Sequence, residues 1–244
     1  FLWSVGGNVT FQRNEITALY GNDTIPQDET QWVVGQPVNT FYLVRSAGVD
    51  PQSGAPMYYT KDGAITDEFS TGHAVLLEGK SPDPRYFGSI NTAVSYKGLT
   101  LSGELFFSGG NYILNYPWRD LNGGGDVVYS AQAADALDYW KKPGDNAKNP
   151  DPSYTVQTTD RWLQKGDYIR LRNVTLSYTL PSYLPNKIRM QKLSFFVQGQ
   201  NLFYKAKEYK GDPEVGLGSE EAGGYHAPGI YALYSYPQVR SISF

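Results

Sequence analysis

Few side chains in this chain of 244 residues are suited to acid–base, nucleophilic or metal chemistry. There is no cysteine, which excludes a disulfide framework, a thiolate metal site and a thiol nucleophile. The two histidines, His73 and His226, lie far apart in the sequence, so a multi-histidine metal site is also excluded. No nucleophile stands in a pattern with a base and an acid. We therefore predict no enzyme, no cofactor and no metal.

One short segment resembles a calcium loop faintly. Asp120, Asn122 and Asp126 surround the glycines at 123–125, but no glutamate follows at the position that would give a bidentate ligand. The glycines are not followed by Lys-Ser or Lys-Thr, so they do not form a phosphate-binding loop either.

Three tryptophans are the candidate substrate-binding residues: Trp118, Trp140 and Trp162 lie in or beside the longest expected loop. The flat face of an indole can stack on a sugar ring. The alternative is that these side chains pack the loop upon itself or against a partner. The sequence alone leaves both open.

Composition narrows the class of protein. The net charge of −3 argues against a nucleic-acid partner, which would need a basic stripe for phosphates. Aromatic residues make up 15% of the chain, and Tyr and Trp suit interfaces such as a membrane belt or a sugar-binding surface. The longest apolar stretch, 230–234, is far shorter than the roughly 20 residues of a transmembrane helix. Transmembrane strands stay possible because they alternate in polarity.

Apolar and polar residues alternate along several segments, which is the pattern of half-exposed strands. The expected strands are 1–12, a short apolar strand at 41–44, 88–96, 99–107, 168–180, 193–203 and 236–244. Lys97 and Gly98 form a two-residue connection between two of them.

The connections alternate between short and long. Those at 97–98 and 181–192 are short, whereas those at 108–167 and 205–235 are long. Long connections are uncommon in compact soluble domains but normal on the outer side of an outer-membrane barrel. A soluble β-sandwich explains the alternation equally well, so the pattern leaves barrel and sandwich open.

One helix is expected inside the connection at 108–167. Apolar residues recur at a spacing of three, with Ser130 as a possible N-cap and Pro143-Gly144 as a stop. The predicted helix spans 130–142 and carries Ala131, Ala134, Leu137 and Trp140 on one side.

Several motifs follow one another in order along the chain. They are GQPVNTFY at 35–42, GVDPQSG at 48–54, the segment 91–101, DRW at 160–162, GDYIRLRNVTLSYTLP at 166–181, VQGQNLF at 197–203, KGDPE at 210–214 and YPQVRS at 236–241. Together they resemble the late-barrel segments of the SusC/RagA family, which are TonB-dependent transporters of the gram-negative outer membrane.

This resemblance implies an all-β fold of antiparallel transmembrane β-barrel strands, with long extracellular loops and one short loop helix. Residues 1–244 would be the C-terminal part of a barrel of about 22 strands, the plug and the earlier strands lying outside this chain. It implies an active importer of oligosaccharides or oligopeptides that works with a SusD-like surface lipoprotein and with TonB, and that contacts outer-membrane lipid. The alternative is a secreted β-sandwich that binds glycans without transport.

A barrel makes predictions for individual residues. A charge at mid-depth on the lipid face costs roughly 2–4 kcal/mol, so Arg170 and Arg172, near Asp167, should lie at the rim or beyond a β-bulge. Residues predicted to face lipid are Ile90, Val94, Leu99, Leu101, Leu105, Val174, Leu176 and Val197; Ser95, Ser102, Glu104, Thr175 and Gln198 should face the lumen. Aromatic residues at strand ends should form girdles: Phe1, Trp3, Phe107, Tyr178 and Phe203.

Sidedness follows from strand parity, because antiparallel neighbours reverse direction at each connection. The short connections at 97–98 and 181–192, and the end of the chain, should be periplasmic. The long connections at 108–167 and 205–235 should be extracellular, with the predicted helix above the membrane and Trp140 against neighbouring loops or a lipoprotein lid.

Overall fold

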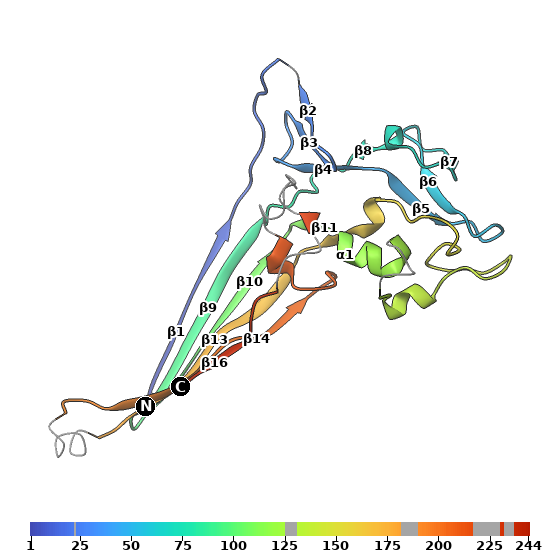
Figure 1. Cartoon of the computed structure of the whole chain (residues 1–244). Coiled ribbons are helices and arrows are strands. Elements are labelled where there is room, and N and C mark those ends of the chain that lie inside the picture. Colours follow the sequence, from blue (N-terminus) through green and yellow to red (C-terminus); the bar gives the residue numbers. More distant parts are fainter. Residues whose placement is uncertain (22, 125–130, 182–189, 217–229, 232–236) are drawn as a thin grey trace.

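The computed structural model describes residues 1–21, 23–124, 131–181, 190–216, 230–231 and 237–244. Its main feature is a six-stranded antiparallel sheet in the order β1-β9-β10-β13-β14-β16, with smaller sheets gathered at one end (Figure 1). The strands are β1 (Leu2–Phe11), β9 (Tyr86–Tyr96), β10 (Leu99–Gly109), β13 (Tyr168–Thr179), β14 (Ser194–Ala206) and β16 (Ser241–Ser243). Among the described residues, no helix has the length and apolar character needed to cross a bilayer.

The period-two pattern of the sequence becomes two distinct faces of this sheet. One cross-strand row on the apolar face joins Trp3, Val94, Leu101, Leu176 and Val197. Leu101 and Val197 are each 50% exposed, and none of the eight residues predicted to face lipid is buried. A sandwich would cover such a row with a second sheet, and no described strand lies over it, so the sandwich alternative is wrong.

The hairpin between β9 and β10 turns through Lys97 and Gly98, as predicted. Both residues have positive φ, 47° and 85°, as a two-residue turn matched to the twist of the strands requires. A Cβ on Gly98 would lie 2.5 Å from the carbonyl oxygen of Thr179 on the next hairpin. Glycine is therefore required here by both conformation and space.

The long connections contain most of the remaining structure. The connection from β1 to β9 forms one sheet of β2 (Thr24–Pro26), β3 (Thr30–Val33), β4 (Thr40–Leu43) and β8 (Val75–Leu76), and another of β5 (Arg45–Val49), β6 (Pro56–Tyr59) and β7 (Ile65–Thr66), with the 3₁₀ turn η1 (Thr71–His73). The strand predicted at 41–44 is thus real, but it belongs to a connection rather than to the main sheet.

The later connections build a third small sheet and several short helical turns. The sheet contains β11 (Tyr112–Asn115), β12 (Leu163–Lys165) and β15 (Ile230–Tyr231). The helical turns are α1 (Tyr116–Arg119), η2 (Asp120–Gly124), η3 (Ala134–Leu137), η4 (Asp160–Trp162) and η5 (Pro213–Gly216).

The helix predicted at 130–142 is wrong for the part that the structure describes. Ser130 lies outside the described residues, and 131–142 contains only the 3₁₀ turn η3. The reason is competition for backbone carbonyls. The Asn149 side-chain amide donates to the carbonyls of Asp135 (2.9 Å) and Asp138 (3.2 Å), which a continuing helix would use itself. The Trp140 amide instead donates to the Asn149 carbonyl at 3.0 Å.

The buried core lies in the connections and not under the main sheet. Phe41, Leu43, Leu77, Leu114 and Trp162 form one buried cluster, drawn from segments far apart in the sequence. A second, smaller cluster contains Val44, Tyr58 and Ala74. We call the small sheets and turns that surround these clusters the loop body. The loop body has a core of its own. Among the described residues, the apolar face of the main sheet is open, whereas the opposite face is covered at the end next to the loop body, where Tyr168 and Arg170 are buried.

Candidate functional site

The face of the main sheet opposite the apolar row is polar and internally hydrogen-bonded. Ser102, Thr175 and Gln198 lie in one cross-strand row, as predicted for the lumen. Beside this row, the Asn173 amide donates to Glu104 at 3.0 Å and accepts from the Gln198 amide at 3.3 Å. Glu104 is therefore held by the amide side chains of a hydrogen-bonded polar ladder. We call this side the polar face.

A β-bulge on β13 decides where the two arginines point. Asn173 pairs with Glu104 of β10 and Leu171 pairs with Leu105, so Arg172 has no partner on β10. The extra residue shifts the alternation by one. Leu171 consequently shares the apolar face with Leu105, and Arg170, opposite Phe106, lies on the polar face. The prediction placed both arginines at the rim or beyond a bulge. Arg172 is the bulged residue itself, and Arg170 lies beyond it, on the polar face.

Arg170 is the centre of a buried ion-pair network. Its side chain is only 1% exposed, and its Nη2 donates to Oδ1 of Asp212, which is 2% exposed. Arg170 Nε lies 2.8 Å from Glu214 Oε2, and Arg172 Nη2 donates to Glu214 Oε1 at 2.7 Å. Two arginines thus face two carboxylates, which compensates charges that would be very costly to bury alone.

Aromatic rings and backbone amides complete the network. The Tyr168 hydroxyl donates to Glu214 Oε1 at 2.7 Å, and the Arg172 guanidinium lies 3.8 Å from the centre of the Phe106 ring. Asp212 also accepts from the backbone amides of Glu214 (3.1 Å) and Gln238 (3.2 Å). The network therefore holds the KGDPE motif and the segment before β16 against the first residues of β13, at the end of the main sheet next to the loop body.

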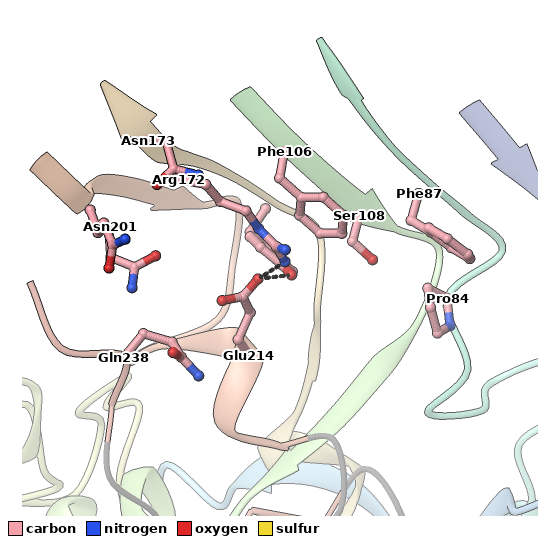
Figure 2. A pocket seen from close by; sticks show the side chains of 11 residues that line it. Pro84, Phe87, Phe106, Ser108, Arg172, Asn173, Asn201, Glu214 and Gln238 are labelled. Atoms are coloured by element: carbon pink, nitrogen blue, oxygen red, sulfur yellow. Dashed lines mark hydrogen bonds and ion pairs between the residues drawn. The ribbon is translucent and has the colours of Figure 1, made fainter. Parts of the chain in front are cut away.

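A pocket of about 620 Å³ opens beside this network on the polar face. Figure 2 shows Arg172 and Glu214 at its centre, with Phe106 and Phe87 on one side and amide side chains on the other. Its lining includes Ser108, Tyr168, Asn173, Gln200, Asn201 and Gln238. Amides, a hydroxyl and a neutralised ion pair can hydrogen-bond a neutral polar ligand.

The residues that we considered for metal binding do not come together. Asp126 lies outside the described residues, while the Asp120 carboxylate pairs with Arg119 and the Asn122 amide donates to the carbonyl of Trp118. In the part of the chain that the structure describes, no three His, Cys, Asp or Glu side chains gather to hold an ion.

The three candidate tryptophans are not brought together as one surface. Trp162 is 3% exposed and belongs to the buried cluster of the loop body, against which Trp118 packs half-buried. Trp140 lies elsewhere, with its Nε1 donating to the carbonyl of Pro51 at 2.9 Å. Its ring covers Gly54 so closely that a Cβ there would lie 2.5 Å from it.

Trp140 thereby explains part of the GVDPQSG motif. Asp50 accepts from the amides of Gln52 (3.1 Å) and Ser53 (3.2 Å) and forms a tight turn. The hydroxyl of Ser53 is the main cause, with the Gln52 amide, of a pKa for Asp50 below its ordinary value. The turn presents Gly54, with φ of 73°, to the indole ring and so joins two distant connections.

The acidic half of the buried network could not be recognised from the sequence. Asp212 and Glu214 stood out only as members of a family motif, and no role followed from their spacing. The available signal was the balance of charge: two arginines at a barrel rim need two carboxylates from a connection. The sequence did not show which connection returns to β13.

The chain matches no family model over any segment. It is similar to TonB-dependent receptor P3 of Formosa agariphila, at 26% identity over the whole of this chain and 26% of that receptor. It is also similar to TonB-dependent receptor P26 of the same organism, at 27% identity over the whole of this chain and 26% of the receptor. The chain thus spans about a quarter of the length of these relatives.

Solved structures share the fold. The RagAB peptide transporter matches 98% of this chain and 26% of its own chain, with a TM-score of 0.84 and 24% identity. The RagAB peptide importer in the "open-open" state matches the same shares with a TM-score of 0.83 and 25% identity. These relatives are receptors and transporters, not enzymes. The chain is therefore similar in sequence to part of two TonB-dependent receptors and shares its fold with part of the RagAB structures, in agreement with its resemblance to the SusC/RagA family.

Proposed function

We propose that this chain forms part of the barrel wall of an active outer-membrane importer. The observation that carries the proposal is the main sheet itself, which has one polar face and one apolar face, and the apolar face is covered by no strand that the structure describes. Lipid on one side and a water-filled or plugged lumen on the other suit these faces. The similarity to TonB-dependent receptors over the whole chain supports the same conclusion.

We further propose that residues 1–244 are the C-terminal part of the receptor, with the plug and the TonB contact elsewhere in it. The long connections leave one end of the sheet, and both chain ends lie at the other (Figure 1). The proposed orientation places the loop body outside the cell and the Lys97–Gly98 turn in the periplasm, because long connections face outward in such barrels. The connection at 182–189 lies outside the described residues.

The proposed cargo is an oligopeptide or an oligosaccharide, captured with a SusD-like surface lipoprotein that covers the loop body. The similarity of the fold to the RagAB peptide transporter supports the first class. Trp118 and Trp140, which are half-buried, stay candidates for substrate contact or for contact with the lipoprotein. Trp162 is covered by its own core, and we assign it to packing.

Uptake by cells that carry the full-length receptor tests the proposal. Labelled oligopeptides and labelled oligosaccharides of similar size are offered separately to receptor-expressing cells and to the same cells with TonB inactivated. We expect TonB-dependent accumulation of one class. Equal accumulation of both labels with and without TonB would overturn the proposed import function.

A further inference from the structure

The upper end of the apolar face carries an aromatic and aliphatic belt. Phe107 of β10, Ile169 of β13 and Lys205 of β14 lie in one cross-strand row, and Tyr86 shares the same face at the start of β9. Ile169 is 40% exposed and Tyr86 is 36% exposed. Under the proposed function this belt lies where the hydrocarbon of the membrane meets the outer headgroups.

Two lysines lie at the upper edge of the belt, Lys205 in its cross-strand row and Lys207 just beyond the end of β14. Lys205 and Lys207 are both exposed, two positions apart on β14 and just beyond its end. Among the ion pairs formed by the described residues, neither lysine has a carboxylate partner. The neighbouring Lys165, in contrast, pairs with Glu208 at 3.2 Å.

A hollow of about 390 Å³ lies between the belt and the lysines. Its lining includes Tyr86, Phe107, Asp167, Ile169, Lys205 and Lys207, so apolar walls lead up to two ammonium groups. The carboxylate of Asp167 is already engaged, because its Oδ1 accepts from the Gly110 amide at 2.7 Å.

Glycine keeps part of this region open. A Cβ on Gly109 would lie 2.4 Å from the hydroxyl oxygen of Tyr86 and 2.7 Å from Oδ1 of Asp167. Any side chain at this position would displace the tyrosine that forms one wall. The Tyr86 ring therefore lies across the end of β10 because residue 109 has no side chain.

We propose that this hollow binds the phosphate headgroup of an outer-leaflet lipid, with Lys205 and Lys207 on the phosphate and the acyl chains against Phe107 and Ile169. The proposal rests on the proposed function, since it needs this end of the sheet to face outward. A soluble anion would use the lysines alone, whereas the apolar walls below them fit an amphiphile. Lysine stems lie along apolar surface while their ammonium groups reach the headgroup level.

The test uses the full-length receptor, delipidated in neutral detergent and titrated with phosphatidic acid, with complex formation followed by native mass spectrometry. The K205Q/K207Q variant should bind phosphatidic acid roughly tenfold or more weakly, since each basic residue near a membrane surface contributes appreciably to attracting anionic lipid. The matched variant K61Q/K142Q, which removes two exposed lysines of the loop body, should bind as the unmodified receptor does.

Two further measurements, on a variant that keeps both charges and on a lipid without net charge, test whether the binding depends on charge. The K205R/K207R variant retains both charges and should retain binding, and phosphatidylcholine should bind weakly to every variant. Unchanged binding in K205Q/K207Q, or complete competition by inorganic phosphate, would overturn the proposal in favour of lipid bound elsewhere or of a simple anion site.

TonB-dependent uptake is measured on the same variants. Normal uptake with no lipid preference refutes only this inference, whereas absent uptake in the unmodified receptor refutes the proposed function.

Discussion

Arg170 shows how one side chain can hold distant segments together. It is buried on the polar face and pairs with Asp212 and Glu214, which come from a connection more than forty positions along the chain. A buried ion pair contributes little net stability compared with apolar side chains of the same size. Removing one partner alone, however, leaves the other charge buried and unpaired. The network therefore specifies where the KGDPE motif lies on β13, and its members depend on one another.

Replacing Asp212 by alanine should destabilise the attachment of the KGDPE motif by about 3–5 kcal/mol, because Arg170 would remain buried without its main partner. Amide hydrogen exchange of residues 205–216 in the full-length receptor measures the effect. The control is Arg13→Met, which breaks an ion pair with 83% and 43% exposed side chains and should change exchange little. Similar exchange in both variants would show that the buried network does not anchor this motif.

Tyr116 predicts a dependence of stability on alkaline pH. Burial, followed by the hydrogen bond that its hydroxyl donates to Glu29, raises the pKa of this phenol well above its ordinary value of 10.0. The unfolded chain then releases the proton more readily than the folded one above pH 10, so stability is retained below that pH and falls as pH rises past it. Thermal unfolding between neutral pH and pH 11 should show a steeper loss in the unmodified receptor than in Tyr116→Phe. Parallel curves for the two proteins would contradict this.

At the scale of elements, the alternation of apolar and polar residues predicted the central strands of the main sheet well. The spacing of apolar residues by three predicted a helix that is not there. Period two is enforced by the two environments of a sheet, so β9, β10 and β13 begin and end close to the expected residues. The helix at 130–142 depended on side-chain spacing alone, and a long-range bond from Asn149 overrode it. The cost of a charge in lipid predicted either a rim position or a bulge for the arginines, and the structure shows a bulge at Arg172.

Adjacent positions on β10 test the two faces directly. Leu101→Arg places a charge in the middle of the apolar row and should cost roughly 2–4 kcal/mol, enough to impair barrel assembly. Ser102→Arg introduces the same group on the polar face and should be tolerated. Heat-modifiable migration of the full-length receptor in gels, together with its amount in the outer membrane, measures assembly. Equal loss for both variants would contradict the assignment of faces.

At the scale of the whole molecule, the described residues combine a main sheet whose apolar face is exposed and a loop body that contains the two buried hydrophobic clusters. Family resemblance and parity predicted the architecture and the side on which connections lengthen. The loop body itself could not be predicted, because its sheets pair short segments whose contacts are set by packing and not by periodicity. The candidate site could also be predicted only in part. The two arginines were identified, whereas their acidic partners and the pocket depend on where the connection after β14 packs against the main sheet.

The exposed apolar face of the main sheet predicts how residues 1–244 behave when they are expressed without the rest of the receptor. Residues 1–244 expressed by themselves should need detergent, since the apolar face is exposed and the outer edges of β1 and β16 are unpaired within the described sheet. Hydrogen exchange in detergent should show stronger protection in the buried cluster around Phe41 and Leu114 than in β1. A monodisperse species in buffer without detergent would contradict the assignment of the apolar face to lipid.

The bulge on β13 has a consequence for insertions and deletions. Losing one residue from a strand normally exchanges the faces of all residues on one side of the gap. Arg172 is different, because β13 already carries one residue more than β10 at this point. Deleting Arg172 leaves Asn173 and Leu171 opposite Glu104 and Leu105 and keeps Arg170 on the polar face, whereas deleting Val174 puts the two sides of the strand out of phase. After this deletion β13 pairs with β10 without a bulge, and the irregularity is confined to Asn201 and Leu202 of β14, which lie opposite Arg172 in the intact chain.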